Sequence, residues 1–510
     1  MVYYIHMGNV CKVLSVAPVG FEGHIIEVES DITKGLPSLQ IVGLANKAIE
    51  EAKERVKSAI ANSLLEYPSR RITVNLAPAE LPKYGTHYDL PIALAILASS
   101  GQIRQKELEN NVFAGELALD GSIRPILCAI TVAETAKRVG AKRIYLPVEN
   151  APQAQLLSSI EVIGISSLKD IYLHLKGEKI LQQYRHQVHR RVTEPSTPLL
   201  DDIYGQEQAK RALIVAAAGH HNILFTGLPG AGKTMLAKAL ANLLPTLDVD
   251  EQLLVTKLHA LAGLTEGDII TERPFRSPHH SSSMVAITGG GSQIKPGEVS
   301  LAHLGVLFLD EIPEYSRVVL EALRQPLEDR VISISRANAK ATFPANFMLV
   351  ATMNPCPCGF YGDQTRECTC SQAQVLAYRK RLSGPLLDRI DMIIPISRIP
   401  TEKLLLSDEL SSKQHSEAQS SIISARNVQI KRYGSSHKNN SSLSTSDIRR
   451  YVPLKQSEKL FLDTAANRLG LTARGYFKIL RVARTIADLE GSSSVSIPHI
   501  AEALQYRQSA

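Results

Sequence analysis

The run G-x-x-x-x-G-K-T at residues 227–234 constrains this chain of 510 residues more than any other feature. It follows a strand-like apolar segment at 222–226 and opens a helix-favouring segment at 235–240. Glycines let backbone N–H groups approach phosphate oxygens, the lysine adds a positive charge, and the threonine hydroxyl is a ligand for Mg²⁺. The pattern predicts a nucleotide site, with ATP or GTP as ligand; a purely structural turn between strand and helix is the alternative. The residues expected to bind the nucleotide and its Mg²⁺ are Gly227, Leu228, Pro229, Gly230, Ala231, Gly232, Lys233, Thr234 and Met235.

A second part of the same site is expected about seventy residues further along. The short apolar run at 306–309 is typical of a buried parallel strand, and it ends in Asp310 and Glu311. Asp310 is expected to hold Mg²⁺, and Glu311 to orient or deprotonate the water that attacks the γ-phosphate. Two acids at a strand end also occur without any such role, but here they follow a phosphate loop.

A third strand-like segment, 347–352, leads to Asn354. A polar side chain at this point would lie between the two earlier strand ends, where it can hydrogen-bond the attacking water or the γ-phosphate. We therefore interpret Asn354 as a sensor of the nucleotide. A turn asparagine preceding Pro355 is the alternative.

Two arginines are candidates for the chemistry of phosphoryl transfer. Arg389 stands between Asp388 and Asp391 at the end of a short predicted helix, where a surface ion pair is the ordinary interpretation. In a ring-forming ATPase such an arginine instead stabilises the charge on a neighbouring subunit's γ-phosphate. Arg474 opens a helix near the carboxyl terminus and is expected to reach back over the same nucleotide and couple the position of the lid to the ATP state.

Four of the six cysteines form the pattern C-x-C-x9-C-x-C directly after the sensor strand, a metal-like cluster unlike a scattered disulfide framework. Four thiolates in one loop complete a closed tetrahedral Zn²⁺ site, which suits a structural metal and leaves no open position for catalysis. Free buried thiols are the alternative. The expected zinc ligands are Cys356, Cys358, Cys368 and Cys370.

Together these motifs resemble AAA+ ATPases of the magnesium-chelatase type. The segments F-R-S-P-H-H at 275–280, I-T-G-G-G at 287–291 and K-P-G-E at 295–298 are similar to the ComM-like bacterial branch of that family. The resemblance covers nearly the whole chain. It implies a hexameric ring with ATP and Mg²⁺ at each subunit interface, Arg389 as the interface finger and Arg474 as a second sensor.

The expected fold class is α/β in three parts. Residues 1–175 alternate strand and helix signals, and the segments 81–95 and 113–121 resemble the protease domain of the Lon family. On that alignment His87 and Ile126 replace the serine and lysine of the protease dyad, so a protease is disfavoured. A basic linker at 176–200, a parallel-sheet AAA+ core at 201–400 and a helical lid within 401–510 follow. Residues 407–446, rich in Ser, Lys and Asn, are predicted to be a low-complexity, flexible connection to the lid.

The charge balance permits a nucleic-acid partner without requiring one, because 57 Lys and Arg stand against 50 Asp and Glu. No long apolar run is present, so we expect a cytoplasmic protein with no membrane partner. The resemblance to chelatase-type ATPases implies that two segments, 266–300 and 332–342, are insertions facing the ring pore, where positive side chains can follow a phosphate backbone. A solvated charged surface is the alternative. The candidate DNA contacts are Arg273, Arg276, Lys295, Arg336 and Lys340.

Two functions therefore compete. The first is a DNA motor that uses ATP to drive branch migration of recombination intermediates, acting on single-stranded or branched DNA. The second is a chelatase-like ATPase that remodels a protein partner for metal insertion. The Lon-like domain and the cysteine loop both favour the first.

Overall fold

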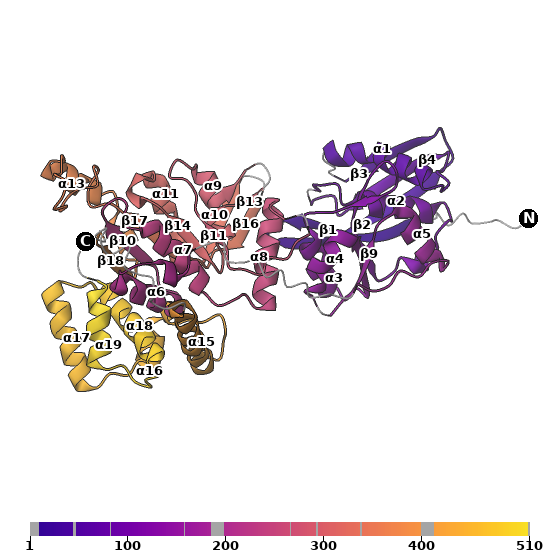
Figure 1. Ribbon diagram of the computed structural model, residues 1–510. Coiled ribbons are helices and arrows are strands. Elements are labelled where there is room, and N and C mark those ends of the chain that lie inside the picture. Colours follow the sequence, from indigo (N-terminus) through magenta and orange to yellow (C-terminus); the bar gives the residue numbers. More distant parts are fainter. Residues whose placement is uncertain are drawn as a thin grey trace, which may run out of the picture. The chain divides into compact units, whose positions relative to one another are not determined.

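The computed structural model describes residues 10–43, 47–81, 83–157, 159–184, 198–265, 267–291, 294–336, 339–398 and 413–507. Two compact units are present (Figure 1). The first comprises Met1–Arg190, Asp248–Thr271 and Ser333–Phe343, and the second comprises Arg191–Leu247, Glu272–Ile332 and Pro344–Ala510. Most of the predicted linker, residues 185–197, lies outside the described residues.

The first unit is built on a seven-stranded mixed sheet of order β3-β4-β2-β1-β5-β8-β9. Its strands are β1 (Cys11–Val19), β2 (Glu22–Thr33), β3 (Ser38–Val42), β4 (Arg71–Ala77), β5 (Asn111–Phe113), β8 (Arg143–Pro147) and β9 (Glu161–Ile165). Its helices are α1 (Lys47–Asn62), α2 (Asp89–Ser99), α3 (Ala129–Arg138), α4 (Ala151–Gln155), α5 (Leu168–Lys176) and α8 (Val249–Ala262), and β6 (Glu116–Leu117) pairs with β7 (Ile123–Arg124). Every residue of α2 is buried, because this helix is apolar on all sides and lies in the core.

Helix α8 and the tip of a hairpin join this first unit although they lie far along the sequence. On α8, Lys257 pairs with Glu134 of α3, and its ammonium lies 4.1 Å from the ring centroid of Phe21. The hairpin consists of β15 (Val331–Arg336) and β16 (Ala339–Pro344), and Phe343 makes an edge-to-face contact with Phe21. The AAA+ core predicted for 201–400 is therefore interrupted twice by segments that belong to the other unit.

The second unit contains a five-stranded sheet of order β11-β14-β17-β10-β18, in which every neighbouring pair is parallel. The strands are β10 (Ile223–Gly227), β11 (Phe275–Arg276), β14 (Val306–Leu309), β17 (Met348–Met353) and β18 (Met392–Ile396). Strands β14 and β17 are buried along their whole length, as their continuous apolar sequences predict. This is the parallel-sheet core that the sequence predicts.

Helices and short hairpins surround this sheet, and further helices form the lid. The core elements are α6 (Glu207–Gly219), α7 (Lys233–Leu243), α9 (Met284–Thr288), α10 (Glu298–Leu301), α11 (Arg317–Ala322), α12 (Arg324–Asp329), α13 (Gln372–Arg379), α14 (Gly384–Leu387), β12 (Gly289–Gly290) and β13 (Lys295–Pro296). The lid helices are α15 (Gln414–Tyr433), α16 (Thr445–Tyr451), α17 (Gln456–Leu469), α18 (Ala473–Leu489) and α19 (Ile497–Gln505), and α15 and α18 pack on α6 (Figure 1).

Helix α15 corrects one expectation from the sequence. The segment 407–446 was expected to be a flexible connection, yet residues 414–433 form a helix of 20 residues. Ile422 and Ala425 are fully buried in the core of the second unit, and Gln429 donates a hydrogen bond to the carbonyl of Ala218. Tertiary packing therefore orders a Ser-rich sequence whose own helical signal is weak.

Candidate nucleotide site and cysteine cluster

The predicted nucleotide residues converge at one edge of the parallel sheet. Strand β10 leads into the phosphate loop and pairs with β17, which leads to Asn354. Strand β17 pairs in turn with β14, which leads to Asp310 and Glu311. Because parallel strands end at the same edge, three segments far apart in the sequence meet beside Lys233.

Glycines shape the phosphate loop at two points. A Cβ atom on Gly227 would lie 2.3 Å from the carbonyl oxygen of Ile396, so only glycine fits where β10 passes β18. Gly232 has a φ of +86° and directly precedes α7, whose first residue is Lys233. This turn directs the first backbone N–H groups of α7 toward the place where phosphates bind.

Lys233 lies at the centre of the site. Its ammonium donates to the carbonyl oxygens of Gly227 at 2.7 Å and Leu228 at 3.0 Å, and to the Oδ1 atom of Asn354 at 2.9 Å. Burial lowers the pKa of Lys233, while the nearby carboxylates of Asp310 and Glu311 act in the opposite direction. All three N–H donors already have acceptors, so a phosphate oxygen would have to replace one of them in order to bind this lysine.

The two acids are positioned by a residue for which the sequence motifs predict no role. Thr352, fully buried at the end of β17, donates its hydroxyl to the Oδ1 atom of Asp310 at 2.5 Å. The same hydroxyl accepts the backbone N–H of Glu311 at 2.8 Å. Glu311 has a φ of +49°, and its side chain accepts a hydrogen bond from Asn354 at 2.9 Å. The backbone turn at Glu311, unfavourable for a residue with a Cβ, is thus held from two sides.

Arg389 and Arg474 share one acidic partner, and their roles at a nucleotide stay predictions. Both guanidinium groups pair with Glu328 of α12, Arg474 at 3.3 Å. Arg389 immediately precedes β18, and its carbonyl accepts a hydrogen bond from Asn222 at the amino end of β10. The phosphate loop follows the carboxyl end of β10, so the length of the strand, roughly 3.3 Å per residue, separates this arginine pair from Lys233.

A polar pocket of about 370 Å³ adjoins this arginine pair. Its wall includes Asp391, which forms an ion pair with Lys478 at 3.0 Å. Burial alone would raise the pKa of Asp391, but Lys478 and His221 hold it well below its usual range. Burial also lowers the pKa of Lys478 to about 8. This buried pair connects β18 to the lid helix α18.

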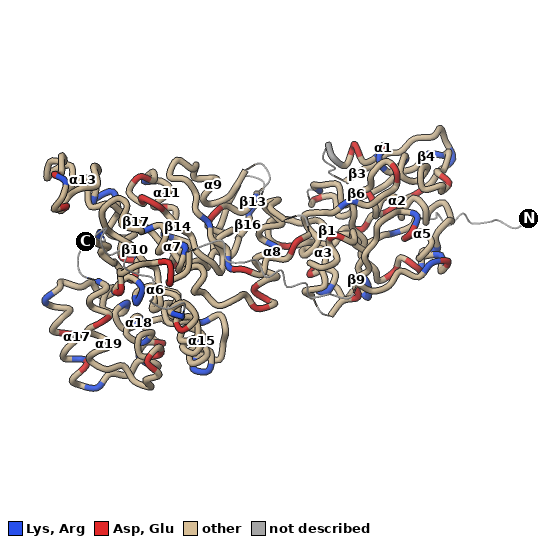
Figure 2. Tube along the Cα trace, viewed as in Figure 1, with Lys and Arg blue, Asp and Glu red and all other residues tan. Residues whose placement is uncertain are grey.

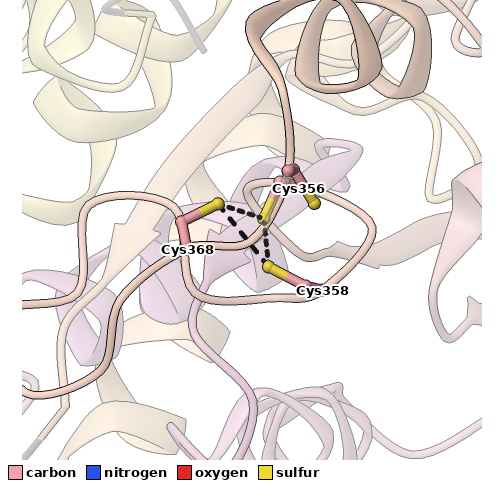
Figure 3. A group of neighbouring side chains, drawn as sticks. Cys356, Cys358 and Cys368 are labelled. Carbon is pink, nitrogen blue, oxygen red and sulfur yellow. Dashed lines mark hydrogen bonds between the residues drawn. The ribbon is translucent and has the colours of Figure 1, made fainter.

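The four cysteines come together as the sequence predicts (Figure 3). Their sulfur atoms all lie within 4.8 Å of one another. The Sγ of Cys356 is 3.4 Å from that of Cys358 and 3.7 Å from that of Cys368, and the latter two are 3.5 Å apart. Tetrahedral Zn²⁺ with bonds of about 2.3 Å needs sulfurs roughly 3.8 Å apart. The two sulfur atoms of a disulfide bond are about 2 Å apart, so the arrangement fits a metal site and not disulfide bonds.

The candidate DNA contacts divide into two groups. Arg273 donates to the carbonyls of Pro245 and Leu304, and Arg276 forms a two-bond ion pair with Glu298, both at 2.7 Å. These two arginines support their own unit, so their prediction as pore contacts is not favoured. The prediction for these two residues rested on their positive charge alone, and a charge in the sequence does not show which partner it has inside the fold.

Lys295 in β13 and Lys340 in β16 are exposed, and neither forms an ion pair with any residue in the described ranges. Arg336 is the last residue of β15, and its side chain lies outside the described part of the structure. In both units Lys and Arg are interspersed with Asp and Glu along the chain (Figure 2). Among the described residues, Lys295 and Lys340 are therefore the remaining candidates for DNA contacts.

His87 in the first unit is a core residue. It is 4% exposed, and its Nε2 atom lies 2.9 Å from the carbonyl oxygen of Val16. Burial lowers the pKa of His87 to about 4, so the ring is neutral at pH 7. Ile126, at the lysine position of the Lon alignment, is also buried. Neither residue offers the chemistry of a protease dyad.

The site and its sheet define a P-loop protein of the AAA+ class. Comparison with known proteins is more specific: "Magnesium chelatase, subunit ChlI" matches residues 199–404, "Subunit ChlI of Mg-chelatase" matches 28–150, and "Magnesium chelatase, subunit ChlI C-terminal" matches 412–507. The chain belongs to the ComM/YifB-type branch of the magnesium-chelatase-like family.

Relatives match along almost the whole chain. The chain is 43% identical to "Competence protein ComM" of Haemophilus influenzae, with 97% of each protein covered. It is 41% identical to "Uncharacterized protein YifB" of Escherichia coli, with 96% of each covered. In contrast, it is 25% identical to the "Magnesium-chelatase 67 kDa subunit" of Chlorobaculum parvum, over 39% of this chain and 26% of that protein.

Among the helices of the described residues, none combines the length and apolarity needed to cross a bilayer.

Proposed function

We propose that this protein hydrolyses ATP with Mg²⁺ as a ring-shaped hexamer and uses the energy to move along single-stranded or branched DNA. The observation that carries the ATPase part is the convergence of Lys233, Asp310, Glu311 and Asn354 at one sheet edge. In this mechanism Lys233 neutralises phosphate charge and Thr234 and Asp310 hold Mg²⁺. Glu311 acts on the attacking water, and Asn354 links that carboxylate to Lys233.

The position of Arg389 supports a ring. This arginine lies at the end of β10 opposite its own phosphate loop, so it cannot stabilise charge on its own chain's nucleotide. A neighbouring subunit would supply the phosphate. Arg474 shares Glu328 with Arg389, and we propose that it faces the same neighbour.

The DNA part rests on similarity along the full length to a protein named for competence, together with the exposed lysines Lys295 and Lys340. We infer branch migration in homologous recombination during natural transformation as the process. The alternative, remodelling of a protein partner for metal insertion, is supported by the family models, which are named after a chelatase subunit, and by the shorter and weaker match to a chelatase subunit.

The ATPase assignment is tested with Glu311→Gln. We expect this variant to bind ATP as the native protein does and to lose hydrolysis, because an amide cannot take a proton from water. Turnover at the native rate would refute the role of Glu311. Lys233→Ala, which loses a buried phosphate ligand, is the matched variant expected to lose binding itself.

The DNA assignment is tested with a labelled four-way junction, with and without ATP. We expect ATP-dependent migration, and ATPase turnover that rises with single-stranded or branched DNA and falls with salt. Absence of both stimulation and salt-dependent DNA binding would refute this assignment and leave the remodelling alternative.

We also propose that the four cysteines hold one structural Zn²⁺. Cys356, from which the loop starts, is fully buried, and its sulfur accepts the backbone N–H of Tyr361 at 3.3 Å, the kind of outer hydrogen bond that orients a metal ligand. Purified protein is expected to contain one zinc per chain. A content well below one equivalent, after purification without chelators, would refute the metal site.

A further inference from the structure

The cysteine loop, residues 356–370, packs directly on the phosphate loop. Gly359 has a φ of +88°, and a Cβ atom placed on it would lie 2.6 Å from the Cγ atom and 3.0 Å from the Cδ atom of Pro229. No side chain fits between the two loops at this point. The proline ring of the phosphate loop therefore rests on the backbone of the cysteine loop.

The same two loops line one pocket of about 880 Å³. Gly227 and Leu228 contribute the wall from the phosphate loop, and Asn354 adds the sensor side chain. The cysteine loop supplies another part of the wall, from Tyr361 to Thr365. A change in the course of the cysteine loop therefore alters both the support of Pro229 and the space beside the nucleotide residues.

Apart from the cysteines, few contacts hold this loop: the guanidinium of Arg366 lies 4.0 Å from the ring centroid of Phe360 within the loop, and that of Arg379 in α13 lies 5.6 Å from the ring centroid of Tyr361. It contains no helix or strand. Its backbone hydrogen bonds are local turns, such as Gly359 to the carbonyl of Cys356 and Asp363 to that of Phe360. A metal bound to all four sulfurs would join Cys356 and Cys358 to Cys368 and Cys370 across the loop, and binding of a metal to a preformed site stabilises that fold directly.

We propose that zinc bound by the four cysteines holds Gly359 against Pro229, and that zinc and ATP consequently bind to this protein cooperatively. The proposal rests on the nucleotide site proposed above. Loss of zinc frees the cysteine loop, removes the support of the phosphate loop, and weakens nucleotide binding. Coupling between two ligands is reciprocal, so bound nucleotide slows the loss of zinc to the same thermodynamic extent.

The first experiment measures the affinity of a fluorescent ATP analogue for the full chain in three states: zinc-loaded, stripped with a chelator, and stripped then reloaded. We expect removal of zinc to weaken binding by roughly 5- to 150-fold, the usual range for coupled sites, and reloading to restore it. Release of zinc to a chromophoric chelator is measured in parallel. We expect it to be slower when the analogue is bound.

Two glycines provide a matched pair of variants. Gly359 and Gly362 lie in the same loop with φ values of +88° and +83°, so alanine strains the backbone similarly at each. A Cβ on Gly362 has no atom within 4 Å, whereas one on Gly359 meets Pro229. Both variants are expected to retain one zinc per chain, and Gly359→Ala is expected to lose severalfold more nucleotide affinity than Gly362→Ala, which lies in the pocket wall but does not meet Pro229.

The outcomes separate this proposal from the proposed function. Equal nucleotide affinity with and without zinc, or in Gly359→Ala and Gly362→Ala, would overturn the coupling and leave the ATPase assignment intact. Failure of the zinc-loaded native chain to bind the analogue at all would instead overturn the nucleotide site. Zinc content of each variant shows whether the cysteine loop has formed, so a misfolded loop is not mistaken for lost coupling.

Discussion

Thr352 offers the sharpest test of how this site is organised, because one hydroxyl serves both acidic residues. The substitution Thr352→Val keeps the branched shape but removes the hydrogen bonds to the carboxylate of Asp310 and from the N–H of Glu311. A hydrogen bond to a charged group contributes about 1.5–3 kcal/mol, and an unsatisfied buried N–H costs about 1–3 kcal/mol. If about 2 kcal/mol of this is lost from the transition state, the turnover number falls roughly 30-fold.

The assay is steady-state ATP hydrolysis at a series of Mg²⁺ concentrations, with thermal unfolding measured alongside. Misplacement of Asp310 is expected to raise the Mg²⁺ concentration needed for half-maximal turnover, an effect that general destabilisation does not produce. Thr352→Ser retains the hydroxyl and is the matched control, expected to stay close to the native rate. A Thr352→Val protein with native turnover and native Mg²⁺ dependence would refute the positioning role.

Three further perturbations test other parts of the structure. Mixing Arg389→Ala with Lys233→Ala subunits, each inactive alone, should restore hydrolysis, because Arg389 lies too far from its own phosphate loop and acts on a neighbour; no recovery in the mixture would contradict this arrangement. Asp391→Asn should lower the free energy of unfolding by about 3–5 kcal/mol in denaturant titrations, since it leaves Lys478 buried without its partner, and the double change with Lys478→Met should recover part of it. His87 has a folded-state pKa of about 4 against an ordinary 6.5, so the unfolded chain binds an extra proton between these values. Stability should therefore be full above pH 6.5 and fall by about 3 kcal/mol down to pH 4, with a shallower slope in His87→Gln.

The motifs that could be predicted from sequence are those whose chemistry is local. The phosphate loop requires glycines, a lysine and a threonine within eight positions, and the four cysteines require only a short loop, so spacing alone indicates both. Asp310 and Asn354 were predictable for a related reason. Each follows a continuous apolar run, and buried parallel strands bring such ends to one edge.

Side chains whose partners lie far away in sequence could not be predicted. The charges of Arg273 and Arg276 suggested DNA, but the fold uses them for carbonyls and for Glu298. Glu328, which pairs with both Arg389 and Arg474, stands in an ordinary helical sequence with no distinguishing signal. The sequence shows that a side chain is charged, but it does not show with which residue that side chain pairs.

Sequence alone was enough to identify the phosphate-loop motif and the group of four cysteines, because both depend on backbone freedom and on ligand atoms a few residues apart. Three contacts are known only from the tertiary structure: Gly359 lies on Pro229, Thr352 connects the two acids, and Arg474 pairs with Glu328. The physical reason is distance. These contacts join residues from 41 to 146 positions apart, and they depend on strand order and packing, which no local pattern records.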